Sequence, residues 1–230
     1  MSRGLNWLQT LAGGQALAGY PASVKVVDGT LGERTARYIA VVPDAENPFP
    51  RARNGEVGLL EGWALGQALD EVIAADRDKA DKRVVVAVVD VPSQAYGRRE
   101  EALGIHQALA GAVDGYARAR LAGHPVIALL VGKAAAARIP LRSVEELEAL
   151  AESVPPMAYD IDNYATLGLL WETLAVDSIE QPSADDLARV RDCLAKAVAD
   201  IGGSSDLRGR LGAPNREASS RVRELLRAQW

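Results

Sequence analysis

The residues best suited to chemistry follow a run of valine and alanine from Val84 to Val89. That run is free of charge and rich in β-branched side chains, a pattern typical of a strand buried on both faces. A polar loop comes next, before a long helical pattern begins. Loops at the carboxyl ends of buried strands are where open α/β folds bind their ligands. We therefore expect the functional site in the segment from Asp90 to Glu101.

Neutral donors and two arginines equip this loop to hold an anion. Hydroxyl and amide groups that could orient a carboxylate or a water come from three residues: Ser93, Gln94 and Tyr96. Gly97 permits close approach of the backbone, and Arg98 and Arg99 could hold a phosphate or a departing carboxylate. The same residues are compatible with a structural role, as turn formers followed by a salt-bridged helix start.

A second candidate lies at the start of a helix predicted from Glu56 to Ala75. Glycine recurs there every fourth residue, at Gly58, Gly62 and Gly66, although glycine costs about 1 kcal/mol in a helix interior. Close packing of the helix on the sheet explains this spacing. Alternatively, the turn formed by Asn54, Gly55 and Gly58 presents backbone amides to a ligand.

The order of predicted elements favours one α/β domain over residues 1–230. A strand, a helix from about Arg99 to Leu121 and an apolar strand from Pro125 to Val131 form a unit that should be parallel and right-handed. Other elements are expected at Gly4–Leu11 (a helix with Trp7 as a packing residue), at Ala22–Val27 and Thr35–Val42 (strands separated by a turn), and at Ser143–Ala151, Ile161–Leu174, Ser183–Ile201 and Arg216–Gln229 (helices). The C-terminal third is therefore predicted to be helical.

Composition excludes several classes of protein. The net charge of −5 and the lack of a basic cluster argue against nucleic-acid binding. Cys193 is the only cysteine, so the chain can form no internal disulfide and no thiolate metal site, and we expect no bound metal. We expect a cytoplasmic protein without signal peptide or membrane span. His106 is interpreted as a core or interface residue and His124 as part of a structural turn.

Two long segments resemble a known family. NGEVGLLEGWALGQAL and VVVAVVDVPSQAYGRREEALGIHQALAGAVDGYARARLAGHPVIALLVGK are similar to the carboxyltransferase branch of the crotonase superfamily, in which a buried strand ends in Asp-x-Pro. The SQAYGRREE variant and the later KAAAARIPLRSVEELEALAESVPPMAYDI most closely resemble the gamma subunits of biotin-independent malonate decarboxylases. The resemblance implies a crotonase-like fold, a spiral of ββα units with a helical C-terminal part.

The chain departs from the family pattern after Lys133. In the family, the strand ending in Gly-Lys is followed by a glycine-containing turn, a helix and another strand, whereas here Lys133 runs directly into Ala134. We expect that a segment is missing at this point, because deleting a central element would expose core surface that nothing in the remaining sequence covers. The turn in that segment would contribute catalytic amides.

The resemblance also implies a reaction. It predicts a subunit that, with a homologous beta subunit, decarboxylates a malonyl thioester on an acyl carrier protein to the acetyl thioester and carbon dioxide. The cofactor would be a CoA-derived arm on the carrier protein, with none bound by this chain. Backbone amides would hold the enolate. The catalytic positions are then Ser93, Gln94, Tyr96, Gly97 and Gly132, and the substrate-binding positions are Asn54, Gly55, Gly58, Arg98 and Arg99.

Two alternatives remain open from the sequence. A biotin-dependent acyl-CoA carboxyltransferase subunit would share the same motifs and would require a biotinylated carrier. A non-catalytic scaffold for the decarboxylase complex would fit a chain that truly lacks the glycine turn after Lys133.

Overall fold

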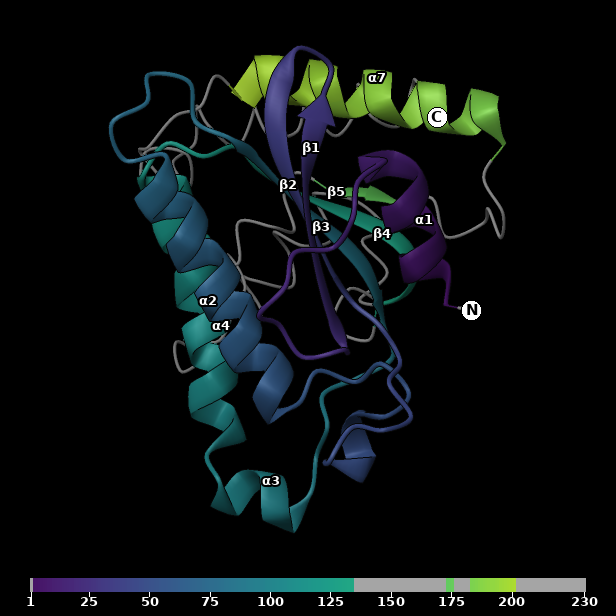
Figure 1. Cartoon of the computed structure of the whole chain (residues 1–230), viewed down its shortest axis with the longest axis vertical. Helices are drawn as coiled ribbons and strands as arrows, with labels where there is room; N and C mark the ends of the chain where they lie inside the picture. The colour runs from purple at the N-terminus through teal and green to yellow at the C-terminus, as the bar shows by residue number, and fades with distance from the viewer. Residues whose placement is uncertain (1, 135–172, 176–182, 202–230) are drawn as a thin grey trace, which may run out of the picture.

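The computed structural model describes residues 2–134, 173–175 and 183–201. These residues form a five-stranded sheet in the order β1-β2-β3-β4-β5, flanked by helices on both faces (Figure 1). The elements are α1 (Arg3–Ala12), β1 (Val24–Leu31), β2 (Arg34–Val41), the 3₁₀ turn η1 (Pro50–Ala52), α2 (Leu59–Ala75), β3 (Val84–Val91), α3 (Arg98–Ala102), α4 (Ile105–Leu121), β4 (Val126–Ala134), β5 (Thr173–Ala175) and α7 (Ala184–Ile201).

The sheet is mixed. Strands β2 to β5 are parallel, and β1 pairs antiparallel with β2 as an edge hairpin. Helices α2 and α4 are the crossovers between parallel neighbours, and the parallel unit predicted around α4 is confirmed, whereas the same role of α2 was not predicted. The α/β class is confirmed, and the succession of strand pair, helix, strand, helix agrees with the ββα units expected of a crotonase-like chain.

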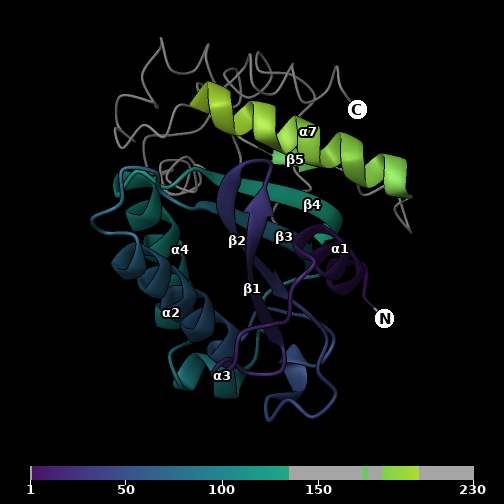
Figure 2. The same cartoon turned by 45° about the horizontal axis from the view of Figure 1, so that its top comes forward.

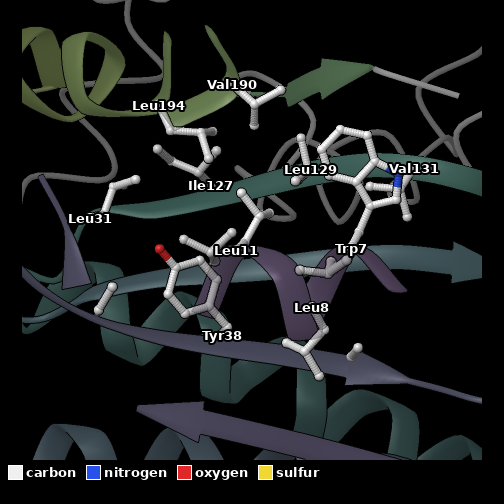
Figure 3. Packing of buried hydrophobic residues seen from close by; sticks show 14 of the residues in the cluster. Trp7, Leu8, Leu11, Leu31, Tyr38, Ile127, Leu129, Val131, Val190 and Leu194 are labelled. Carbon is white, nitrogen blue, oxygen red and sulfur yellow. The ribbon is translucent and has the colours of Figure 1, made fainter. Parts of the chain in front are cut away.

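Strand β3 is buried on both faces because alternate residues enter two separate cores. Val84, Val86 and Val88 pack with α1 and α7, whereas Val85 packs with α2 and α4. Figure 3 shows the first of these cores, in which Trp7 lies near Leu129 and Val131. The Trp7 side chain is fully buried, so its predicted role in packing is confirmed. Figure 2 shows α7 and α1 away from the α2 and α4 pair.

Glycine at position 62 of α2 and at position 115 of α4 allows these two helices to approach each other closely. A Cβ atom on Gly62 would lie 2.8 Å from the carbonyl carbon of Ala108, and one on Gly115 would lie 2.9 Å from a methyl carbon of Leu69. Contacts that short do not accommodate a side chain. The packing explanation therefore holds at Gly62, where the partner is a neighbouring helix and not the sheet, whereas Gly66 has ordinary van der Waals distances around it and Gly58 lies beside Glu61, Ala52 and Ala95.

Several predicted boundaries are wrong. The segment expected as a long turn is largely strand, and the hairpin closes over Gly32 and Glu33, where Gly32 adopts φ +61°. The helix expected from Arg99 to Leu121 is interrupted at Gly104, with φ +85°, and so divides into α3 and α4. The helix expected from Glu56 begins at Leu59. Each interruption falls on or beside a glycine, where a reversal of the backbone costs least.

The C-terminal prediction is partly confirmed. Helix α7 begins after Ser183, whose hydroxyl accepts the Asp186 N–H while the Asp186 carboxylate accepts the Ser183 N–H. Thr173 and Leu174 are not the end of a helix but form β5, where Leu174 pairs with Leu129. The remainder of that predicted helix, and the helices expected at Ser143–Ala151 and Arg216–Gln229, lie outside the described residues. Pairing with the sheet thus overrides the local helical pattern at β5.

Candidate functional site at the carboxyl edge of the sheet

The carboxyl ends of β2, β3 and β4 meet at one edge of the sheet because these strands are parallel. The loops that follow β2 and β3 leave this edge together, and η1 and α3 lie below it in Figure 1. The ten predicted site residues lie in these loops, in the first turn of α3 or near the end of β4. The structure therefore brings both predicted segments to the same edge.

A short parallel bridge joins the two segments. Val57 N–H donates to the Ser93 carbonyl at 3.1 Å, and Ala95 N–H donates to the Val57 carbonyl at 2.9 Å. The Ala95 side chain packs in a small buried cluster with Phe49 and Ile105. The polar loop after β3 is thus held against the turn that precedes α2, a contact that the sequence did not predict.

The side chains of the β3 loop differ in what they can offer a ligand. Gln94, Tyr96 and Arg98 are exposed, and Tyr96 is 60% exposed, so its phenol is accessible. The Ser93 hydroxyl donates to the Gln94 carbonyl at 3.0 Å, which is the behaviour of a turn former. Arg99 lies over the Phe49 ring, 4.9 Å from its centroid. Gln94, Tyr96 and Arg98 are therefore the side chains best placed to meet a substrate.

Gly97 caps the start of α3 in an extended conformation. A Cβ atom at this position would lie 2.1 Å from a carboxylate oxygen of Glu100, a residue that is itself buried. A side chain at position 97 would therefore require the Glu100 carboxylate to move.

The backbone amides of the turn before α2, which were predicted to face a ligand, donate to acceptors within the chain. Asn54 N–H donates to the Glu56 carboxylate at 3.0 Å, Gly55 N–H to the Ala52 carbonyl at 3.3 Å, and Gly58 N–H to the Glu61 carboxylate at 3.0 Å. Gly55, at φ +93°, forms a turn that packs on Pro43. Their assignment to substrate binding stays a prediction, and the observed bonds give these residues a role in shaping the loop.

Glu61 is a buried carboxylate that the sequence reading missed. It accepts hydrogen bonds from the Ser23 hydroxyl, from the Asn47 amide at 2.7 Å and from Gly58 N–H. Asn47 is also buried, and its side-chain oxygen accepts Phe49 N–H at 2.9 Å. Glu61 therefore ties the proline-rich loop after β2 to the start of α2. The sequence signal was a glycine followed three residues later by glutamate, the spacing of a helix cap.

Strand β4 is irregular where it reaches this edge. Val89 pairs with Leu130 and Val91 pairs with Ala134, so one residue of β3 lies opposite three of β4. Gly132 is the middle one of the three. A Cβ atom on Gly132 would lie 2.1 Å from Oδ1 of Asp90, the residue opposite. Gly132 therefore lies beside Asp90 near the end of β3, and its assignment as a catalytic position stays a prediction.

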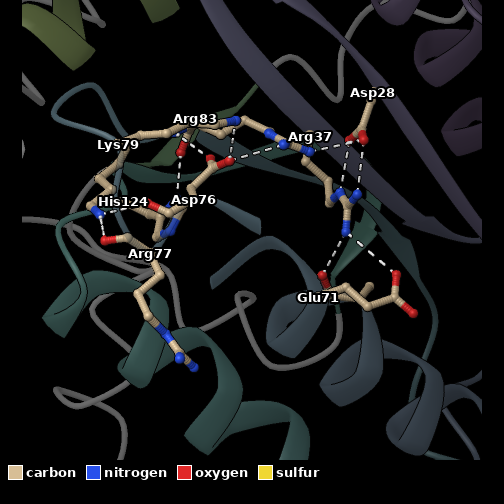
Figure 4. Close-up of polar contacts among 10 residues, drawn as sticks. Asp28, Arg37, Glu71, Asp76, Arg77, Lys79, Arg83 and His124 are labelled. Carbon is tan, nitrogen blue, oxygen red and sulfur yellow. Dashed lines mark hydrogen bonds and ion pairs between the residues drawn. The ribbon is translucent and has the colours of Figure 1, made fainter. Parts of the chain in front are cut away.

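A polar network lies at the opposite, amino edge of the sheet (Figure 4). The guanidinium of Arg37 is paired with both oxygens of Asp28 at 2.7 and 2.8 Å, and Arg83 joins Asp28 to Asp76. Burial opposes ionisation of Asp28 and Asp76, but the neighbouring hydrogen bonds and charges outweigh burial and lower both pKa values. This network holds the strands and α2 together, far along β3 from the predicted site.

The two histidines take no part in the site. The Nδ1 atom of His124 lies 2.8 Å from the Arg83 carbonyl oxygen, so its structural role is confirmed. Burial lowers the His124 pKa. His106 is exposed on α4, which excludes the core alternative. Cys193 falls in α7, and its side chain lies outside the described part.

Within the described ranges, no group of three His, Cys, Asp or Glu side chains could hold a metal ion. None of the helices described there is long and apolar enough to cross a membrane.

Comparisons with known proteins agree with this architecture. The family model for the malonate decarboxylase gamma subunit matches residues 52–136 and 132–230, two stretches that overlap at residues 132–136. A chain of a Pseudomonas malonate decarboxylase hetero-tetramer, solved in complex with coenzyme A, is 62% identical with a TM-score of 0.71, and the match covers 100% of both chains. A chain of the Pseudomonas malonate decarboxylase MdcD-MdcE hetero-dimer is 58% identical with a TM-score of 0.70, over 100% of this chain and 99% of that one.

A more distant relative is the malonyl-S-ACP:biotin-protein carboxyltransferase MADD of Malonomonas rubra. The identity is 27% over an alignment 206 positions long, and the match covers 74% of this chain and 67% of MADD. Together with the mixed sheet, these comparisons make the chain a carboxyltransferase-like α/β subunit. More narrowly, the chain belongs to the malonate decarboxylase gamma-subunit family.

Proposed function

We propose that this chain pairs with a homologous beta subunit and that the pair decarboxylates malonyl-S-acyl carrier protein. The products are acetyl-S-acyl carrier protein and carbon dioxide. The observation that supports this most strongly is the 58% identity, over the whole chain, to a chain of a solved malonate decarboxylase hetero-dimer. A cytoplasmic setting fits a chain with one cysteine.

The reaction moves one electron pair and one proton. The bond between the malonyl α-carbon and its carboxylate breaks, carbon dioxide leaves, and the electron pair becomes an enolate whose charge lies on the thioester oxygen. A proton then adds to the α-carbon. The barrier falls when hydrogen-bond donors are already aimed at that oxygen, and backbone amides do this without reorganisation.

The chain's residues suit these needs in different ways. Gly97 and Gly132 are the positions at the carboxyl edge where the backbone comes closest to other groups, so we assign the amides around them to the enolate. Gln94 and Tyr96, both exposed, are assigned to orienting the malonyl carboxylate. Ser93 serves mainly to hold their turn, since its hydroxyl donates to the Gln94 carbonyl.

The carrier protein's CoA-derived arm ends in the thioester and contains phosphate. Arg98, exposed at the start of α3, fits the role of meeting that phosphate, because a guanidinium matches phosphate geometry. Arg99 fits it less well, since its guanidinium lies over Phe49. The arm supplies only the thioester linkage, and this chain's part is to hold the arm and to orient the malonyl group.

The test is release of carbon dioxide from malonyl-loaded carrier protein by the purified beta-gamma complex. Arg98→Met should raise the KM for the loaded carrier with little effect on kcat, because a phosphate contact is made equally in ground and transition states. Arg77→Met, an exposed arginine at the opposite edge, is the matched control and should change neither constant. Failure of the wild-type complex to release carbon dioxide would exclude the proposed function.

A second candidate is transfer of the malonyl carboxyl group to biotin on a partner protein. The name of the MADD relative favours it, although identity to that protein is only 27%. The two reactions separate cleanly when the assay is run with and without a biotinylated protein. Decarboxylation in its absence supports the first proposal, and strict dependence on it supports the second.

A non-catalytic scaffold remains the third possibility. It is linked to the expected missing segment after Lys133, and the intact mass of the purified subunit tests it. A mass larger by about one strand-helix unit would place the glycine turn in the protein. A mass equal to that of the printed sequence favours the scaffold.

A further inference from the structure

The bulge in β4 is a defined feature of the candidate site. Three residues of β4, with Gly132 at the centre, face the single residue Asp90 of β3. Bulges of this kind change the direction of the backbone and often occur next to active sites. The position of the Gly132 backbone therefore depends on whatever holds the bulge open.

The Asp90 side chain occupies the space that the bulge leaves. Its Oδ1 atom lies 2.1 Å, and its Cγ atom 2.8 Å, from the place where a Gly132 Cβ atom would be. No residue with a side chain fits at 132 while Asp90 keeps this conformation. The carboxyl group thus fills the position that a side chain at residue 132 would take.

The other oxygen of Asp90 is fixed by the start of α1. Gly4 N–H donates to Oδ2 at 3.1 Å, and a Cβ atom on Gly4 would lie 3.1 Å from the Asp90 Cβ atom. A carboxylate is favoured at a helix N-terminus, where unpaired N–H groups point outward. The Asp90 side chain therefore joins an element remote in sequence to the bulge, and it is held at both ends.

We propose that Asp90 is a positioning residue, which fixes the Gly132 bulge so that the backbone amides there meet the enolate oxygen. The inference rests on the proposed function and adds a residue to it. A shift of about 1 Å in such a group can cost on the order of 100-fold in rate. The side chain acts through its shape and its hydrogen-bonded fixation at α1.

The test compares three substitutions in the beta-gamma complex, with kcat and KM measured per mole of assembled complex. Asp90→Ala removes the carboxyl group that occupies the bulge. It should lower kcat about 10- to 100-fold while KM stays within about threefold, since the amides act mainly in the transition state. Asp90→Asn keeps the volume and an oxygen for Gly4 N–H, and should retain kcat within about threefold. Asp90→Glu keeps the charge but presses against Gly132, and should be as impaired as Asp90→Ala.

Thr10→Ala is the matched control. It removes a hydroxyl in the last turn of α1 that donates to the Asn6 carbonyl at 2.7 Å, without touching the start of α1 or the bulge, and it should leave kcat unchanged. If Asp90→Ala does not assemble, the Asn and Glu variants decide. An active Glu variant with an inactive Asn variant, or an assembled Ala variant with kcat within twofold of wild type, overturns the inference. An inactive wild-type complex instead refutes the proposed function itself.

Discussion

Adding one methyl group to α2 should have opposite effects at two glycines one helical turn apart. At Gly62, the new Cβ atom would lie 2.8 Å from the Ala108 carbonyl carbon and 2.9 Å from its oxygen. These are backbone atoms, so no side-chain rotation relieves the contact. At Gly66, the nearest atom outside α2 would be 3.6 Å away, which is an ordinary van der Waals distance.

The expected magnitudes follow from two terms. Both substitutions gain about 1 kcal/mol of helix propensity. Gly62→Ala also incurs an overpacking cost of about 1–3 kcal/mol. Gly66→Ala should therefore raise the free energy of unfolding by up to about 1 kcal/mol, whereas Gly62→Ala should lower it by up to about 2 kcal/mol. Because the propensity term is common, the difference between the two variants measures the packing cost alone.

The assay is thermal unfolding of the full chain at one fixed concentration, followed by far-UV circular dichroism. For a chain of this size, 1 kcal/mol shifts Tm by about 2–4 °C. Gly111→Ala is the matched control on α4, since nothing lies within 4 Å of its added Cβ atom. It should behave like Gly66→Ala. Equal shifts in the same direction for Gly62→Ala and Gly66→Ala would refute the close approach of α2 to α4 at Gly62.

Three further predictions concern buried polar groups. Glu61→Gln should lower the free energy of unfolding by about 1–3 kcal/mol and speed hydrogen exchange across residues 43–58, because one of its three hydrogen-bond donors would face an NH₂ group. Glu46→Gln, at an exposed position in the same loop, is the control and should change neither quantity. The Asp28 pKa is lowered from 3.8, so the stabilising effect of this carboxylate is present above that pH and is lost as the pH falls below it. Asp28→Asn should therefore be less stable than wild type at neutral pH but should lose less stability in acid, which urea unfolding at several pH values measures. The His124 pKa is lowered from 6.5, so the unfolded chain binds the proton first and the free energy of unfolding should fall as the pH drops below about 6.5. His124→Asn should remove this loss of stability. If the loss persists in that variant, or disappears in His106→Asn instead, His124 is not its source.

Local patterns were sufficient for the elements whose cause is local. The charge-free run of valine and alanine from Val84 to Val89 marks a strand with two buried faces, because any polar side chain there would lose its water. Ser183 followed by Asp186 marks the start of α7, because each side chain satisfies the other's backbone N–H. The segments that resemble the gamma subunits of malonate decarboxylases also led to the family, because they are motifs of neighbouring residues.

Contacts between distant residues were decided only by the tertiary structure. Nothing near Gly62 in the sequence states that its neighbour is Ala108, and nothing near Gln94 states that its loop pairs with Val57. The same holds for Glu61, which reads as one more acidic residue of a helix until Asn47 is brought to it.

The candidate site divides in the same way. The sequence by itself determined the residue types at the ends of β3 and β4 and the glycines that allow close approach. Folding decided which amides remain available to a ligand. Gly58 N–H already donates to the Glu61 carboxylate, and the Asp90 side chain occupies the space beside Gly132. The physical reason is that hydrogen bonds and steric contacts act over a few ångströms in space, whatever the separation of their partners along the chain.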